Sequence, residues 1–208
     1  TTGDSLTMTN SYVIPTTGTV TATKEWVNGP SAKPEVWFQL HRKTGTGSWE
    51  IVPGAEIKQV PVAPAELKVE WSGLETTDIN GNAYEFGVVE GSYKNNTFTA
   101  GAPENYTATA QPSLEITNTY VPPKREDIMV SKAFKISCDG IIVDDEDIAV
   151  PVTPVTLELR RKSSVEEDYQ KVGESVTLDG NIDAVEFFPW QAKFIDLDAT
   201  DKDGNPYT

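Results

Sequence analysis

An internal repeat constrains the fold of this 208-residue chain more than any other feature. The segment MTNSYVIP at 8–15 returns as ITNTYVPP at 116–123, and Asn10 and Asn118 are therefore 108 residues apart. A second segment, TVTATKEW at 19–26, resembles IMVSKAF at 128–134, with Lys24 and Lys132 again separated by 108 residues. A period of this length is too long for a solenoid and predicts tandem domains.

The repeat also predicts where the domains begin and end. We interpret residues 1–14 as the final strand of a preceding repeat and residues 15–122 as one complete unit. Residues 124–208 then begin a second unit that stops before its own Asn-Thr-Tyr ending. The linker is Pro122-Pro123, which is semi-rigid because proline fixes the backbone angle φ.

Short strands with period-2 alternation fill the complete unit, and clusters of Gly, Pro and Asn separate them. No segment has the 3.6-residue periodicity of an amphipathic helix. We therefore expect an all-β chain of tandem antiparallel β-sandwiches of the Ig-like kind, the second of them incomplete.

The alternation places one polar residue on the inward face of each of three strands. These residues are Lys24, Glu90 and Asn118, and the residue two positions before each of them on the same face is apolar. Each alone would cost several kcal/mol, roughly 2–7, if it were buried without a partner. One cluster in which the three meet is therefore the expected arrangement. The same alternation of side chains places Lys132 and Asn10 on the inward faces of the corresponding strands in the other copies of the repeat.

Composition excludes several functions. The chain has 17 Lys and Arg against 32 Asp and Glu, and its net charge of −15 argues against nucleic acid or an anionic membrane as a partner. No apolar run reaches the length of about 20 residues that a membrane span needs. One cysteine, Cys138, excludes an internal disulfide, and one histidine, His41, excludes a zinc site built on two histidines.

We predict neither a metal nor a cofactor. Acidic residues between Asp196 and Asp203 suggest a calcium loop, but Ala199 occupies the first ligand position relative to Asp201, Asp203 and Gly204. A plain hairpin turn is the expected structure there.

The chain resembles the B-type repeat domains of Gram-positive collagen adhesins, the Cna-B domains that also build pilus stalks. The resemblance rests on Lys-Glu-Trp at 24–26, LHRK at 40–43, WSGL at 71–74, FGVVE at 86–90 and ITNTY at 116–120. It covers residues 15–122 well and residues 124–208 in part.

The resemblance implies that the domain forms its own isopeptide bond between Lys24 and Asn118, with Glu90 as the catalytic residue. Burial lowers the pKa of a lysine and leaves a nucleophilic amine. A protonated Glu90 is expected to hydrogen-bond the amide oxygen and to move protons to the departing ammonia. A second site with Lys132 is incomplete, because its Glu and Asn would lie past Thr208. Asn10 of another copy is the candidate to approach Lys132.

We therefore expect a structural segment of an extracellular adhesin or pilin, anchored to the cell wall through a segment not present here. Its work is mechanical, and its cross-linking is a single turnover, so it is not an enzyme. Its expected partners are neighbouring repeats, host extracellular matrix, or another copy through strand exchange. The alternative is a β-sandwich module that binds matrix protein or glycan, which a ladder of exposed aromatic residues would favour.

Overall fold

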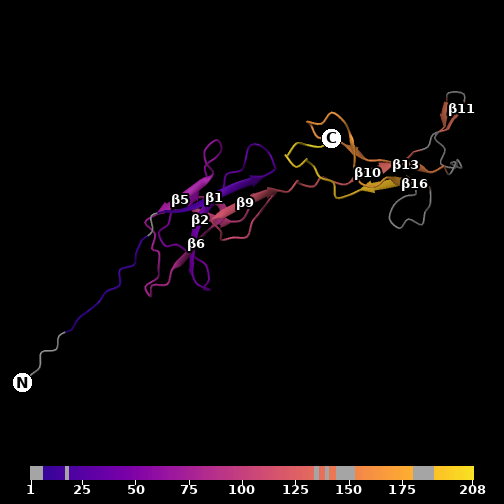
Figure 1. Ribbon diagram of the computed structural model, residues 1–208. Helices are drawn as coiled ribbons and strands as arrows, with labels where there is room; N and C mark the ends of the chain where they lie inside the picture. Colours follow the sequence, from indigo (N-terminus) through magenta and orange to yellow (C-terminus); the bar gives the residue numbers. More distant parts are fainter. Residues whose placement is uncertain (1–6, 17–18, 134–135, 139–140, 144–152, 180–189) are drawn as a thin grey trace, which may run out of the picture. The chain divides into compact units, whose positions relative to one another are not determined.

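The structure is a computed structural model, and it describes residues 7–16, 19–133, 136–138, 141–143, 153–179 and 190–208. The chain divides into two compact units, Thr1–Val121 and Pro122–Thr208. The described residues form strands and turns and contain no helix, so the fold is all-β (Figure 1). No helix capable of crossing a membrane is therefore found among them.

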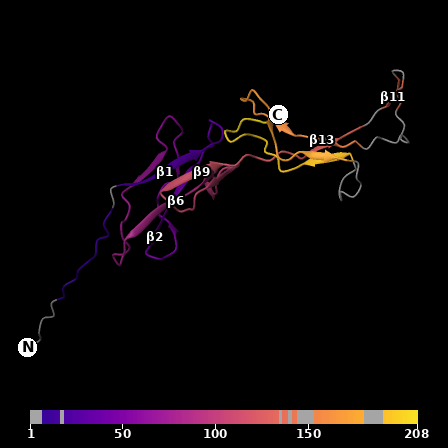
Figure 2. The ribbon, with the colours of Figure 1, turned by 45° about the vertical axis from the view of Figure 1, so that its right-hand side comes forward.

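The first unit contains a four-stranded sheet with the strand order β5-β1-β9-β8. Its strands are β1 (Thr19–Val27), β5 (Lys68–Ser72), β8 (Tyr106–Ala108) and β9 (Glu115–Tyr120). Strand β1 lies between β5 and β9, and β8 forms the outer edge beyond β9. Strands β1 and β9 lie side by side in both views (Figures 1 and 2).

The pairing of β1 with β9 corrects the expectation of a purely antiparallel sandwich. These two strands run parallel, with Lys24 opposite Ile116 and Trp26 opposite Asn118, whereas β1–β5 and β8–β9 are antiparallel. The chain reaches β9 only after passing through the other sheet. A long crossover of this kind permits parallel pairing, which a hairpin does not.

A second sheet of five strands completes the first unit, with the order β3-β2-β6-β7 and with β4 paired to β2. Its strands are β2 (Trp37–Thr44), β3 (Glu50–Ile51), β4 (Lys58–Gln59), β6 (Tyr84–Lys94) and β7 (Thr97–Ala100). All of its pairings are antiparallel.

One hydrophobic core joins the two sheets. Its buried members come from β1, β5 and β9 on one side and from β2, β6 and adjoining loops on the other. They are Ala22, Val36, Phe38, Leu40, Val52, Val60, Val69, Trp71, Val88 and Ile116. Apolar residues alternate with exposed polar ones along β1, β5 and β9, so that each strand buries a single face.

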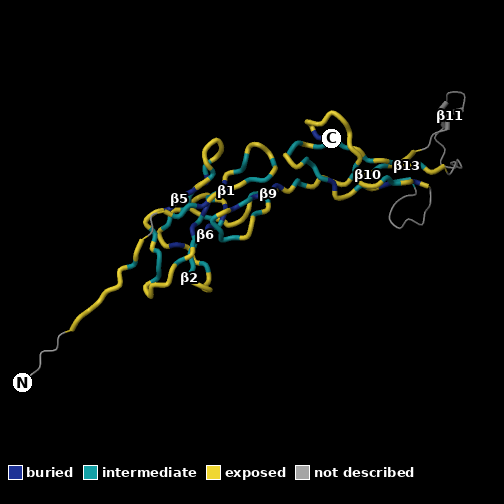
Figure 3. The backbone as a smooth tube through the Cα atoms, in the orientation of Figure 1, coloured by how far each residue is buried: buried dark blue, intermediate teal, exposed yellow. Residues whose placement is uncertain are grey.

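The segment before β1 is extended and exposed. Its described residues 7–15 contain no strand, and all of them are exposed except Ile14 (Figure 3). The Tyr12 hydroxyl makes a 2.8 Å hydrogen bond with the Thr77 side chain. Within this chain the segment therefore does not form the strand that its sequence resembles, and its assignment to a preceding repeat stays a prediction.

The second unit consists of four described strand pairs. Strand β10 (Ile128–Ser131) pairs with β17 (Gln191–Phe194), and β11 (Ile136–Cys138) with β12 (Ile141–Val143). The other pairs are β13 (Val155–Leu157) with β16 (Val176–Leu178), and β14 (Arg160–Arg161) with β15 (Gln170–Lys171). All four pairings are antiparallel.

Equivalent hydrogen bonds recur in the two units, and they reveal that the sequence repeat is also a structural one. The Lys24 amide donates to the Leu67 carbonyl at 2.8 Å, and the Lys132 amide donates to the Trp190 carbonyl at 2.8 Å. The pairing of β10 with β17 thus reproduces that of β1 with β5, in the same register.

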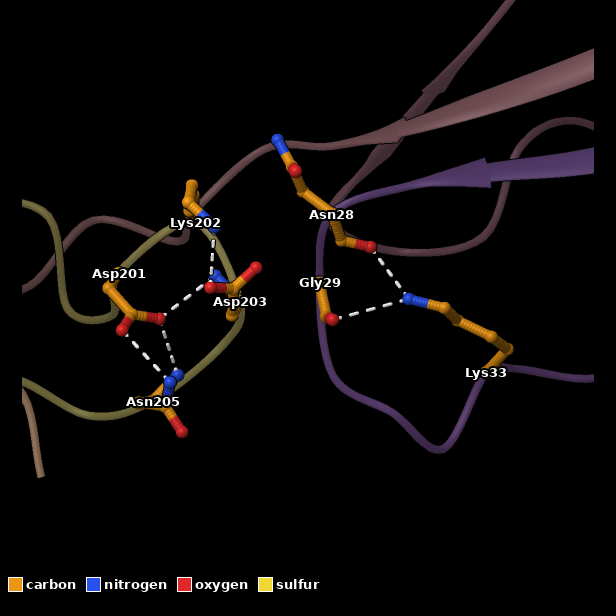
Figure 4. Close-up of polar contacts among 7 residues, drawn as sticks. All are labelled: Asn28, Gly29, Lys33, Asp201, Lys202, Asp203 and Asn205. Atoms are coloured by element: carbon orange, nitrogen blue, oxygen red, sulfur yellow. Dashed lines mark hydrogen bonds and ion pairs between the residues drawn. The ribbon is translucent and has the colours of Figure 1, made fainter. Parts of the chain in front are cut away.

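A carboxylate-centred turn is repeated as well. Asp78 accepts hydrogen bonds from the amide and the side chain of Asn82, at 2.8 Å each. In the second unit Asp201 accepts from the amide and the side chain of Asn205, at 2.8 and 2.9 Å (Figure 4). Both carboxylates are satisfied by the turn itself, in agreement with the expected hairpin turn.

Candidate functional site

Three strands bring Lys24, Glu90 and Asn118 together inside the first unit. Lys24 lies on β1, Glu90 on β6 and Asn118 on β9, so the cluster spans both sheets. The side chains of Lys24 and Glu90 are fully buried, and Asn118 is 0% exposed. The inward orientation that the alternation predicted for these residues is confirmed.

Glu90 contacts both other members of the cluster. Its Oε2 lies 3.1 Å from Lys24 Nζ, as an ion pair rather than an aligned hydrogen bond. Its Oε1 accepts a 2.8 Å hydrogen bond from Asn118 Nδ2. The carboxyl group therefore lies between the amine and the carboxamide, with one oxygen facing each of them.

The surroundings of Lys24 favour the free amine. Burial lowers the pKa of Lys24, and this effect outweighs the opposing attraction of Glu90. Two contacts act in the opposite direction and favour the ammonium form: Nζ lies 4.2 Å from the centre of the Trp26 ring and donates a 3.2 Å hydrogen bond to the Glu25 carbonyl. An amine in this setting is a better nucleophile than an exposed lysine, which is protonated at neutral pH.

The orientation of Asn118 differs from the expected one. We expected Glu90 to hydrogen-bond the amide oxygen, but Glu90 faces the amide nitrogen. The Asn118 Oδ1 atom is buried and has no hydrogen-bond partner. An unpaired buried carbonyl costs about 1–3 kcal/mol, so Asn118 in this orientation is a destabilising group in the core.

The strand register places the two reacting residues near each other. Lys24 pairs with Ile116, and Asn118 lies two residues further along β9, on the same inward face. Adjacent strands are about 4.8 Å apart and each residue advances about 3.3 Å, which puts the two Cα atoms about 8 Å apart. A lysine side chain is long enough to reach across this diagonal.

A fourth residue was missed by the sequence analysis. Gln111 Oε1 accepts a 2.6 Å hydrogen bond from the Glu90 backbone amide. Gln111 comes from the loop between β8 and β9, which has no periodicity to assign its side chain a direction. No signal in a single sequence identifies such a contact, because it depends on how the loop crosses β6.

A groove of about 550 Å³ adjoins the cluster. Six of its lining residues are Lys24, Trp26, Lys33, Val36, Val60 and Leu67. One wall is the loop after β1, which Lys33 holds in place by donating to the carbonyls of Asn28 and Gly29 at 2.6 and 3.2 Å (Figure 4). The side chain of Lys24 is itself fully buried, so the groove passes beside the amine without exposing it to solvent.

The candidates for the second site are not buried. Lys132 and Asn10 are both exposed, whereas the alternation placed them on inward faces. The reason is structural: β10 pairs with β17 only, among the described strands, and residues 7–15 form no strand. In the first unit β6 and β9 enclose Lys24, and no described strand does the same for Lys132.

Other features of the described residues bear on the alternatives. All five tryptophans are buried or half-buried, so they form no ladder of exposed rings. Within the described ranges, no group of three or more His, Cys, Asp or Glu side chains is placed to hold a metal ion. Comparisons with protein-family models, curated proteins and solved structures find no match for this chain.

Proposed function

We propose that this chain is a structural segment of a bacterial surface adhesin or pilin, made of tandem Ig-like domains of the Cna-B type. Its first domain is stabilised by an isopeptide bond between Lys24 and Asn118. The observation that carries the proposal is the buried cluster, in which Glu90 contacts the amine and the carboxamide at 3.1 and 2.8 Å.

The proposed role of Glu90 is that of a proton relay. One proton passes from Lys24 Nζ to Glu90, which leaves a free amine and a carboxylic acid. The amine attacks Asn118 Cγ, and a new C–N bond forms. Glu90 then protonates Asn118 Nδ2 through Oε1, the C–N bond to that nitrogen breaks, and ammonia leaves. The attacking nitrogen gives its second proton to Glu90, so that the products are the new amide, neutral ammonia and Glu90 as a neutral carboxylic acid.

Folding supplies the rest of the catalysis. The strand register holds the amine and the carboxamide on neighbouring strands, which replaces a bimolecular encounter by an intramolecular one. The reaction occurs once per molecule, since the catalyst and both reactants belong to the same chain.

A mechanical role follows from the position of the bond. Strand β1 is the first strand of the unit in the sequence and β9 is the last, and the two pair in parallel. A pull on the two ends of the unit's chain therefore loads the hydrogen bonds between these strands in shear. A bond from Lys24 to Asn118 transmits this load covalently. It also closes a segment of 94 residues, which is worth roughly 4–5 kcal/mol by the loop-entropy model used for disulfides.

Intact mass spectrometry tests the proposal. The folded chain is expected to weigh one ammonia less than its sequence, and Lys24→Ala and Glu90→Ala are expected to have their full calculated masses. Tandem mass spectrometry of a digest should locate the link between the peptides that contain Lys24 and Asn118. A full mass for the folded, unsubstituted chain would refute the cross-link.

The surface location is tested separately. Antibodies against the first unit should label intact bacteria that express the natural protein, and a protease added outside the cells should remove the label. Labelling only after the cells are permeabilised would contradict an extracellular role.

A further inference from the structure

We propose that the indole ring of Trp26 is a shield between the groove and the Lys24 amine, and that it keeps water and foreign electrophiles from this amine until the amine reacts with Asn118. The inference rests on the proposed cross-linking, because it concerns the amine of that reaction. Three observations carry it: the position of the ring, the rings that support it, and the complete burial of an amine beside an open groove.

The Trp26 ring contacts the amine and also lines the groove. Its centre lies 4.2 Å from Lys24 Nζ, and both residues belong to the lining of the groove. The two side chains share the inward face of β1, since they are two residues apart on one strand. The Lys24 side chain has no exposed surface, whereas Trp26 is half-buried. The ring is therefore placed to close the groove over Nζ.

A second aromatic ring packs against Trp26. Tyr106 on β8 meets Trp26 edge to face, with 5.0 Å between the ring centres, and Tyr120 on β9 meets Tyr106 in the same way at 5.3 Å. Aromatic pairs of this geometry attract each other beyond the effect of their burial. A side chain at Gly29 would begin 2.5 Å from the Tyr106 hydroxyl, so the turn after β1 packs directly on these rings. Trp26 is thus supported by its neighbours in one position.

The charged groups around Lys24 Nζ come from two strands and one loop. Glu90 on β6 lies 3.1 Å away, Glu25 on β1 acts through space, and Lys33 from the loop after β1 lines the groove. Strand β9 contributes Asn118, which carries no charge. Among the described residues, no other titratable side chain belongs to the groove lining. Both carboxylates raise the pKa of Lys24, and neither favours the free amine.

The exclusion of water is what the ring contributes to the chemistry. Burial is the largest influence on the pKa of Lys24 and lowers it, which leaves a free amine. Water that entered from the groove would solvate the ammonium form and return the pKa towards its ordinary value. The Trp26 ring itself attracts an ammonium ion, so it favours the free amine only through the water that it excludes.

Reductive methylation of lysines with formaldehyde and dimethylamine–borane tests the shield without the cross-link. The background is Asn118→Ala, which cannot form the bond, and the internal reference is Lys68, whose side chain is 45% exposed. Lys24 is expected to stay unmethylated while Lys68 reacts. Trp26→Leu in this background should raise the methylation rate of Lys24 about tenfold or more, and Trp26→Phe should restore most of the protection. Mass spectrometry of a digest measures both lysines in each sample.

Trp37→Leu is the matched control. Trp37 is also half-buried and also packs on a tyrosine, Tyr93, with 5.2 Å between the ring centres, but it belongs to β2 in the other sheet. This variant should leave Lys24 protected. The inference is overturned if Lys24 in the Asn118→Ala chain is methylated as fast as the reference, or if Trp37→Leu removes as much protection as Trp26→Leu. The second result would show a general loosening of the unit.

A change behind the shield keeps the test valid if Trp26→Leu fails to fold. Tyr106→Leu removes the supporting ring and retains Trp26, so it should also raise the methylation rate of Lys24. Tyr106→Phe retains the supporting ring and should leave that rate unchanged. Unaltered protection of Lys24 in Tyr106→Leu and in every folded Trp26 variant overturns the inference.

The second readout is the loss of ammonia after refolding, in chains that retain Asn118. Trp26→Leu should cross-link more slowly than the unsubstituted chain at neutral pH and approach its rate as pH rises, since a hydrated amine loses its proton only at higher pH. Trp26→Phe should restore the pH profile, and an unchanged profile in Trp26→Leu overturns the inference. No ammonia loss from the unsubstituted chain at any pH refutes the cross-link instead, and the methylation of Lys24 then decides on the shield alone.

Discussion

Lys24 Nζ lies 3.1 Å from Glu90 Oε2 in the core, with both side chains fully buried. The same separation occurs on the surface, where Lys43 Nζ lies 3.1 Å from Glu85 Oε2 and the side chains are 22% and 62% exposed. Both glutamates belong to β6. The two pairs differ chiefly in burial, and burial decides how strongly each carboxylate contributes to stability and chemistry.

Removal of Glu90 is expected to be far more costly than removal of Glu85. In an Asn118→Ala background, which cannot form the cross-link, Glu90→Ala leaves the Lys24 amine buried without its partner and should cost about 3–5 kcal/mol. Glu85→Ala removes a solvated partner and should cost less than about 1 kcal/mol. Urea unfolding measures both, and equal losses would contradict the buried pair.

The stability of the chain without the cross-link is expected to rise with pH. Burial lowers the pKa of Lys24 in the folded state, so the unfolded chain binds the proton more readily. The contribution is complete above the ordinary lysine pKa of about 10.4 and is lost as pH falls through the lowered value. Comparing Asn118→Ala with the double variant Asn118→Ala/Lys24→Met isolates this effect.

The measurement is the difference in unfolding free energy between these two variants from about pH 7 to pH 10. This difference should shift in favour of the lysine variant as pH rises, in the window set by the lowered pKa. A shift in the opposite direction would show that the attraction of Glu90 outweighs burial at Lys24.

Period-2 alternation predicted the inward faces of Lys24, Glu90 and Asn118, because a strand's side chains can only point to one side or the other. The repeat likewise anticipated that β10 would reproduce β1, since equal spacing implies equivalent positions in equivalent folds. These are local properties, and a single sequence contains them.

Properties that depend on distant parts of the chain could not be predicted. The parallel direction of β9 depends on the route of the chain through the other sheet, and Gln111 reaches Glu90 from a loop without a pattern. Lys132 shares the local pattern of Lys24 but is exposed, because burial needs covering strands as well as an inward face. Contacts inside the core determine which atom of Asn118 faces Glu90, and the spacing of residues in the sequence does not predict this orientation.

Gln111 is expected to position Glu90. Its side-chain oxygen accepts the Glu90 amide hydrogen at 2.6 Å, and Gln111→Ala leaves that buried N–H without its acceptor. The expected cost is about 1–3 kcal/mol, together with slower cross-linking because Glu90 is less well held between its two partners. The fraction of chains that lack one ammonia, followed by mass spectrometry after refolding from urea under conditions that permit the reaction, measures the rate.

Gln39→Ala is the control for this prediction, since Gln39 on β2 lies opposite Val89 and its side chain contacts the His41 ring at 3.2 Å. It should cross-link at the unsubstituted rate. Gln111→Ala with an unchanged rate and unchanged stability would show that β6 alone fixes the position of Glu90.

The carboxylate-centred turns are expected to stabilise both units without calcium. Hydrogen bonds from Asn82 lower the pKa of Asp78, and at Asp201 those from Asn205 and Asp203 outweigh the effect of burial, which raises the pKa. Asp78→Ala and Asp201→Ala should each lower the Tm of their own unit by several degrees. Because a lowered carboxyl pKa stabilises the fold above its ordinary value near 3.9, the loss should be largest at neutral pH and should disappear in acid.

Calorimetry with added Ca²⁺ or with a chelator should give unchanged Tm values, since each carboxylate is already occupied by its own turn. A Tm that rises with Ca²⁺, and that Asp78→Ala or Asp201→Ala makes insensitive to it, would contradict this account and make the turn a metal site.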